Sequence, residues 1–81
     1  MNKYVSEFNI GEECKIIKVI AEGKIKRRLF DMGVTPGASI VLKKVAPLGD
    51  PIEVMLRGYD LSLRKDEAKC IYAEVIKWSL L

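Results

Sequence analysis

The sequence contains no histidine. This absence removes the side chain that most often serves as a general base, a metal ligand and a switch near neutral pH. Neither G-x-x-x-x-G-K-S/T nor G-x-G-x-x-G occurs, so no recognised phosphate-binding loop is present. Ser39, Ser62 and Ser79 have no evident partner base, and we interpret them as surface hydroxyls. With no nucleophile–base pair in view, we expect no enzymatic activity and no cofactor.

Cysteine and long apolar runs are also scarce. The two cysteines, Cys14 and Cys70, form no C-x-x-C pair and are too few to build a disulfide framework. We interpret them as free thiols in a reducing cytoplasm, although a single disulfide could form if their strands were neighbours. No segment approaches the ~20 apolar residues that span a bilayer, and the N-terminus lacks the apolar region of a signal peptide. These features predict a cytoplasmic protein that does not itself cross a membrane.

The charge is mildly basic, at +3, from 14 basic and 11 acidic side chains. The strongest basic cluster is Lys24–Arg28, and its simplest interpretation is the solvated face of a helix. Aromatic residues are few, and no pair of them on adjacent strands suggests a stacking platform for bases. Nucleic acid is therefore an unlikely partner, but a small basic nucleic-acid-binding barrel stays open as an alternative.

Four carboxylates are metal-ligand candidates by residue type. Their spacing matches no calcium-binding loop, and turn chemistry or helix-end electrostatics explains each of them. We predict no metal site. The four residues are Asp50, Asp60, Asp66 and Glu67.

The stretch LFDMGVTPG, residues 29–37, predicts the end of a helix followed by a tight turn. Ile25, Leu29 and Met32 recur at helical spacing and predict a helix over about 22–32. Gly33 suits the left-handed residue that commonly ends a helix. Pro36 and Gly37 suit the central positions of a type II turn leading into a strand.

Short apolar runs predict five strands, at about 14–20, 38–45, 52–57, 61–64 and 69–76. The adjacent Ile16 and Ile17 predict a β-bulge, and residues 1–13 read as a loop anchored by Phe8 and Ile10. Residues 65–68 predict one short helical turn. The breakers between strands are Gly49, Asp50 and Pro51 in one hairpin loop and Gly58 in a turn over 58–60. Together they predict a mainly β fold, a small closed or nearly closed barrel with one inserted helix, as a single domain over residues 1–81.

Three ordered motifs resemble those of the FeoA family. Residues 28–37 resemble its RL..LGL.PG signature, Gly49-Asp50-Pro51 its GDP, and residues 58–68 its G..LALR..EA ending, with Ile71 and Ala73 following. The order and spacing agree from about residue 11 to 75. The chain departs from the pattern at Met32, Ser62 and Ala73, and its tail through Leu81 is an extension.

This resemblance implies an SH3-like β-barrel with an inserted helix. It also implies a small cytosolic accessory protein of ferrous-iron uptake in bacteria or archaea, with the permease FeoB and its cytosolic GTPase part as the expected partner. Family descriptions attach transition-metal binding to this domain, which a chain without histidine supports poorly. Similar barrels form the C-terminal domains of metal-dependent repressors, so a regulatory domain of that kind is an alternative. No helix-turn-helix precedes the barrel, so we do not expect an intact repressor.

The residues and the resemblance both predict a protein-interaction module. Barrels of this type recognise partners in grooves between loops through aromatic and charged side chains. We therefore predict one partner-binding patch made of Leu48, Met55, Arg57 and Tyr59. The apolar segment Trp78–Leu81 either packs over a barrel opening or contacts a partner.

Overall fold

The structure, a computed structural model, describes residues 1–78. Its elements in chain order are β1 (Asn2–Tyr4), the 3-10 helix η1 (Val5–Glu7), β2 (Glu12–Val19), α1 (Gly23–Asp31), β3 (Ser39–Val45), β4 (Ile52–Leu56), β5 (Tyr59–Leu63), α2 (Lys65–Ala68) and β6 (Ile71–Trp78). The mainly β prediction is confirmed, as are the single inserted helix near 22–32 and the short helical turn at 65–68.

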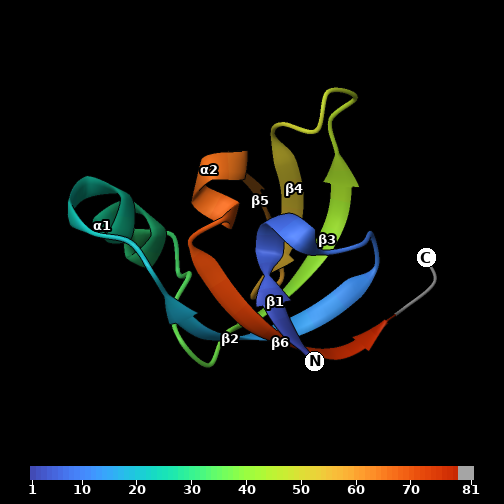
Figure 1. Cartoon of the computed structure of the whole chain (residues 1–81), viewed down its shortest axis with the longest axis horizontal. Coiled ribbons are helices and arrows are strands. Elements are labelled where there is room, and N and C mark those ends of the chain that lie inside the picture. Colours follow the sequence, from blue (N-terminus) through green and yellow to red (C-terminus); the bar gives the residue numbers. More distant parts are fainter. Residues whose placement is uncertain (79–81) are drawn as a thin grey trace.

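The strands form one antiparallel sheet in the order β1-β6-β2-β3-β4-β5, which curls around the core (Figure 1). The sheet has six strands, one more than predicted. The additional strand is β1, in the segment that we expected to be a loop, where Lys3 lies opposite Ala73 of β6. Three polar residues show no alternation of apolar and polar positions, so the sequence gives no sign of this strand. Its pairing is supplied by β6, more than 60 residues away in the chain. The anchor prediction is right for Phe8, which is buried, and wrong for Ile10, which is exposed.

The predicted bulge in β2 is present. The register of β2 against β6 shifts between Ile16 and Lys18. Ile16 is buried, while Ile17, which is 41% exposed, and Lys18 after it both face away from the core. The extra residue of the bulge thus shifts the inward-facing positions from the even-numbered residues to Val19, which packs against the core.

The core lies inside the curled sheet and is almost entirely aliphatic. In β4 the alternation is as predicted, since Ile52, Val54 and Leu56 are buried and Glu53 and Met55 between them are not. The buried apolar residues of the core are Val5, Phe8, Cys14, Ile16, Leu29, Val34, Ala38, Ile40, Leu42, Ile52, Val54, Leu56, Leu63, Ala68, Ile71 and Ala73.

Helix α1 ends in a Schellman motif. Gly33 has φ +91° and its N–H donates to the Phe30 carbonyl, while the Val34 N–H donates to the Leu29 carbonyl at 2.9 Å. Val34 and Leu29 are both fully buried, which is the apolar contact that accompanies this motif. Immediately afterwards the Ala38 N–H bonds the Thr35 carbonyl, closing a turn in which Gly37 has φ +91°.

The two hairpins of β3, β4 and β5 differ in length. Residues 46–51 form the long β3–β4 loop, in which the Gly49 N–H donates to the Ala46 carbonyl at 2.7 Å. Between β4 and β5 only Arg57 and Gly58 intervene, at φ 51° and 86°, as in a type I′ turn. The turn therefore lies one residue earlier than the predicted 58–60, and Tyr59 and Asp60 belong to β5.

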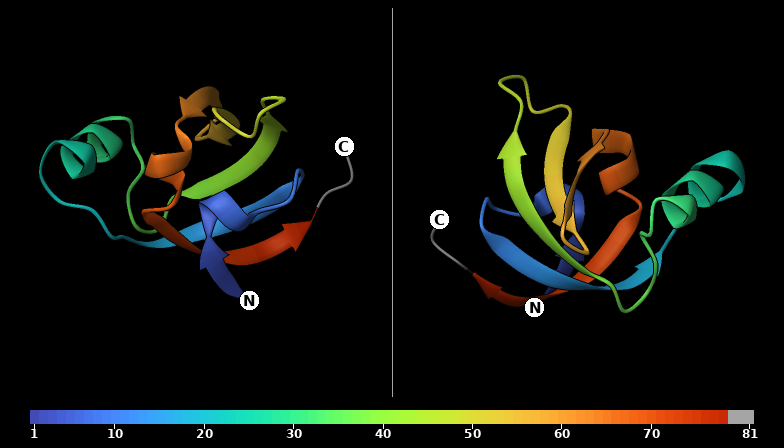
Figure 2. Two further views of the ribbon diagram at one scale, coloured as in Figure 1. Left: turned by 45° about the horizontal axis from the view of Figure 1, so that its top comes forward. Right: turned by 180° about the vertical axis from the view of Figure 1, so that it is seen from behind.

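Helix α1 projects from the side of the barrel (Figure 2). Leu29 is its only buried residue. The apolar face formed by Ile25, Leu29 and Met32 is only partly covered, because Met32 is half-buried but Ile25 remains 45% exposed. Helical periodicity identifies an apolar face, but only the packed barrel decides how much of that face is covered.

Candidate functional site

The β4–β5 turn is fastened to the segment that follows α1. The Tyr59 hydroxyl donates to the Met32 carbonyl, and Arg57 Nη2 donates to Thr35 Oγ1 at 3.2 Å. A Cβ on Gly33 would lie 3.6 Å from Arg57 Nε, so backbone and side chains are closely packed here. These contacts hold the Arg57 and Tyr59 side chains in place while leaving much of each exposed, Tyr59 by 45%.

The structure divides the predicted patch into two places. Met55, Arg57 and Tyr59 lie near the β4–β5 turn, and we call these three residues the hairpin surface. Tyr59 is paired with the buried Leu56 and Met55 with Asp60, so the Met55 and Tyr59 side chains point to opposite faces of the hairpin. Leu48 lies in the β3–β4 loop. This loop is at the other end of β4 from the β4–β5 turn (Figure 1), and β4 is roughly 13 Å long at 3.3 Å per residue. Leu48 is 96% exposed. Sequence reasoning missed this separation because residues close in the chain can lie at opposite ends of one strand.

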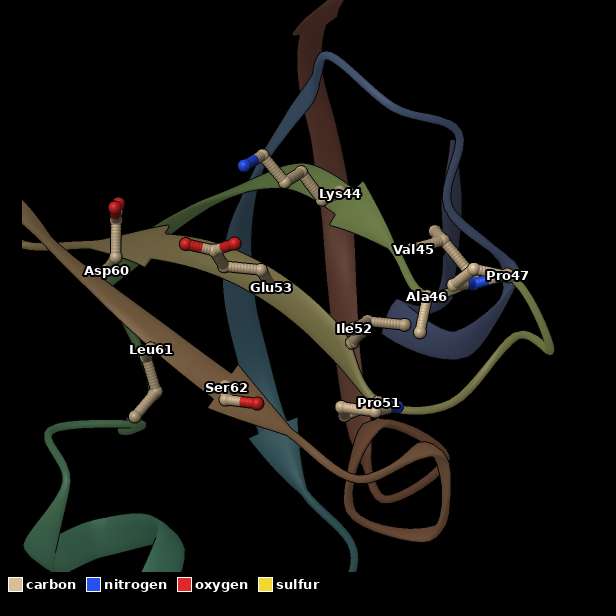
Figure 3. A pocket seen from close by; sticks show the side chains of 10 residues that line it. All are labelled: Lys44, Val45, Ala46, Pro47, Pro51, Ile52, Glu53, Asp60, Leu61 and Ser62. Atoms are coloured by element: carbon tan, nitrogen blue, oxygen red, sulfur yellow. The ribbon is translucent and has the colours of Figure 1, made fainter.

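A shallow groove of about 470 Å³ adjoins the β3–β4 loop (Figure 3). Its sides carry Lys44, Glu53 and Asp60 from three neighbouring strands, and its end is formed by the prolines of the loop. These three charged residues are separated in the sequence, and the pairing register of β3, β4 and β5 brings them together. The lining residues are Lys44, Val45, Ala46, Pro47, Pro51, Ile52, Glu53, Asp60, Leu61 and Ser62.

Three of the four candidate carboxylates, those of Asp50, Asp60 and Glu67, have structural partners. Asp50 accepts the Lys65 N–H at 3.0 Å, and Asp60 pairs with Lys43 Nζ at 3.0 Å. Glu67, which is buried, accepts the Arg64 N–H and pairs with Arg28. Within residues 1–78 no three Cys, Asp or Glu side chains gather closely enough to hold a metal ion. The residues present therefore do not fit the transition-metal binding that the family resemblance implies.

A second buried acid, Glu12, ties the N-terminal strand to the barrel. It is 5% exposed, accepts the Asn9 N–H and pairs with Lys3 Nζ at 3.0 Å. Burial pushes the pKa of Glu12 upward, but the Asn9 hydrogen bond and the Lys3 ammonium together outweigh it, so the pKa is lowered. The carboxylate is thus held ionised as a structural group.

Neither cysteine forms a disulfide. Cys14 is fully buried, and desolvation with the nearby Glu12 and Glu13 charges raises its pKa to about 12. A thiol of this kind is not a nucleophile at neutral pH. β2, which holds Cys14, does pair with β6, the strand that follows Cys70. However, Cys14 lies opposite Val75, five residues along the chain from Cys70, so the two thiols are not opposite each other.

Among the described residues no helix has the length and apolar character needed to cross a bilayer. The predicted tail falls largely on residues 79–81, outside the described residues. Its first residue, Trp78, is the last of β6, is 59% exposed and donates through Nε1 to the Ile10 carbonyl at 3.0 Å.

The family model of the FeoA domain matches residues 4–75, nearly the whole barrel. The chain belongs to the FeoA family. Among curated proteins, it is similar to an Fe(2+) transport protein A/Fe(2+) transporter FeoB fusion protein of Porphyromonas gingivalis, with 33% identity over 72 residues. That match covers 89% of this chain but 8% of the fusion protein.

Solved structures of the family share the fold. An FeoA-like protein of Clostridium acetobutylicum is 41% identical, with a TM-score of 0.88 over 99% of this chain and 93% of that one. FeoA of Stenotrophomonas maltophilia, described as an SH3 domain protein complexed with zinc, is 25% identical, with a TM-score of 0.78 and 89% of each chain covered. The predicted SH3-like barrel of the FeoA family is thereby confirmed.

The same fold occurs in a manganese-dependent transcriptional repressor. Identity is 12% and the TM-score 0.85, over 93% of this chain and 42% of that one. At this identity the likeness concerns the fold alone, so the alternative of a repressor's regulatory domain gains no functional support from it.

Proposed function

We propose that this FeoA-family protein is a non-enzymatic accessory module of ferrous-iron uptake that acts in the cytoplasm by binding the cytosolic part of FeoB. The observation that carries the proposal is the Porphyromonas gingivalis relative, whose name joins the matched region and FeoB in one chain. Fusion gives two modules a high effective concentration, which favours pairs that already bind each other.

The chemistry of the described residues agrees with a binding role. The sequence has no histidine, and the fully buried Cys14 cannot act as a thiolate. Three of the four acids considered as metal ligands take part in hydrogen bonds or ion pairs, as Asp50 and Glu67 show. What the molecule offers instead is a set of exposed, well-positioned side chains.

We place the contact with FeoB at the hairpin surface. Tyr, Arg and Met are enriched at protein interfaces, and groups held rigid before binding lose less entropy on association. Tyr59 and Arg57 are held by their bonds to Met32 and Thr35. Met55 is 38% exposed on the other face of the same hairpin. Leu48 marks the competing location, because its exposure makes it a strong apolar contact if the β3–β4 loop is the one that docks.

The test is calorimetric titration of the full chain into the purified cytosolic part of FeoB from the same organism. We expect Met55→Glu and Arg57→Gln each to weaken binding by tenfold or more, as hot-spot residues do. Leu48→Glu, at the other end of β4, serves as the matched control and should leave affinity unchanged.

If Leu48→Glu alone weakens binding, the docking surface is the β3–β4 loop and the hairpin assignment is wrong. If the wild-type chain does not bind the cytosolic part of FeoB at all, the proposed partner itself is wrong. Circular dichroism of each variant checks that the fold is retained.

A further inference from the structure

Helix α1 leaves an amphipathic surface uncovered. Every residue of α1 except Leu29 is exposed. The exposed side chains are not all polar, because Ile25 and Phe30 are 45% and 40% exposed and Ile20 just before the helix is 48% exposed. A helix that served only to connect β2 to β3 would not need large apolar groups facing solvent.

The same helix carries most of the net charge. Four of the 14 basic residues and two of the 11 acidic ones lie within residues 22–31, so the rest of the chain is nearly neutral, with ten basic and nine acidic side chains. Within residues 1–78, Arg28 pairs with Glu67, whereas Lys24, Lys26 and Arg27 make no ion pair. The two acids of this segment, Glu22 and Asp31, flank the basic cluster at its ends.

Basic and apolar groups are interleaved at short range on this helix. Lys26 Nζ lies 5.7 Å from the centre of the Phe30 ring. A hollow of about 350 Å³ on the helix is lined by Gly23, Lys26, Arg27, Phe30 and Asp31. The hollow thus brings together two cations, one carboxylate and an aromatic ring.

We propose that α1 is a membrane-surface contact that places the barrel on a bilayer rich in anionic phospholipid. Lys24, Lys26 and Arg27 would bind headgroup phosphates, while Phe30 enters the boundary between headgroups and acyl chains. Nine helical residues span only about 13 Å. The contact is therefore weak and reversible, suited to concentrating the protein at a surface.

Lipid fits this surface better than nucleic acid does. Both offer phosphates to Lys and Arg, and single-stranded bases can also stack on an aromatic ring, but the interfacial region of a bilayer additionally favours burial of aliphatic side chains such as Ile20 and Ile25 beside the basic ones. The inference goes beyond the proposed function and does not rest on it, because it concerns a different surface and needs no permease.

The test is co-sedimentation of the full chain with vesicles of phosphatidylcholine alone or with 30% phosphatidylglycerol. Binding should require the anionic lipid and fall sharply between about 50 mM and 500 mM salt as charges are screened. Replacing Lys24, Lys26 and Arg27 with Gln should weaken it at least tenfold, since each base near such a surface is worth roughly a fivefold change in affinity. The matched control, Lys15→Gln with Lys44→Gln and Lys69→Gln, removes the same charge elsewhere and should weaken binding far less.

Phe30→Ser separates interfacial burial from charge attraction. It should reduce vesicle binding about threefold or more while leaving the salt dependence intact. Equal binding by the triple Gln variant and the control would overturn the proposal, as would equal binding to neutral vesicles. Tighter binding to a generic duplex oligonucleotide, at matched phosphate concentration and unaffected by Phe30→Ser, would assign the helix to nucleic acid instead.

Discussion

Single residues with restricted backbone conformations fix where the elements of this protein end. Gly33 has φ +91° at the end of α1, a conformation that L side chains rarely adopt, and its neighbours Leu56 and Tyr59 lie within contact distance of an added Cβ. Space is adequate there, so the restriction comes from the backbone and not from a clash.

We therefore predict that Gly33→Ala destabilises the fold by about 1–2 kcal/mol through backbone strain. Gly33→Asn should lose less folding stability than Gly33→Ala, because Asn tolerates the left-handed region better than Ala. Urea unfolding of the three proteins measures the difference. Equal stability of Gly33→Ala and the wild type would show that the Schellman geometry contributes little.

At the scale of elements, one buried carboxylate connects two helices. Glu67 is 5% exposed, and its Oε1 accepts the Arg64 N–H at 2.9 Å, at the start of α2. Its Oε2 lies 3.1 Å from Arg28 Nε on α1. This side chain and the buried Leu29 hold the projecting helix to the barrel.

The element-scale prediction concerns the order of two Glu67 variants. Glu67→Ala removes both interactions and leaves a helix-start N–H unpaired, so we expect a loss of about 1–2 kcal/mol in unfolding free energy. Glu67→Gln keeps a side-chain oxygen that can accept the Arg64 N–H, so its loss of unfolding free energy should be smaller. Thermal unfolding followed by circular dichroism measures both, and a Gln variant as unstable as the Ala variant would contradict the role assigned to the Arg64 hydrogen bond.

At the scale of the whole molecule, the fold depends on pairing between the two ends of the described chain. β1 lies against β6, and Lys3 of β1 pairs with Glu12 at the start of β2. The Glu12 carboxylate is thus part of the junction that joins the N-terminal segment to the barrel.

This junction predicts a specific dependence of stability on pH. Because the pKa of Glu12 is lower in the folded chain than in the unfolded one, its stabilising contribution is complete above the unfolded value, near 4.3, and is lost as the pH falls through the folded value. Glu12→Gln should be less stable than the wild type at pH 7, with a flatter decline of the urea midpoint below pH 5. Glu74→Gln, on an exposed position of β6, is the carboxylate control and should keep the wild-type decline.

The sequence by itself determined the features that depend on neighbouring residues. The helix end at Gly33, the turn at Pro36–Gly37, the alternation in β4 and the helical turn at 65–68 all follow from local backbone preference and side-chain period, so they are readable in one short window. The family resemblance was readable for the same reason, because its motifs lie in these turns.

Only the tertiary structure decided what depends on distant partners. It paired the polar residues 2–4 with β6, separated Leu48 from Tyr59 by the length of β4, and brought Lys44, Glu53 and Asp60 to one groove. It also left Ile25 and the basic side chains of α1 uncovered. The physical reason is that burial and pairing are properties of contacts across the fold, and a periodic pattern specifies which face is apolar but not what, if anything, covers it.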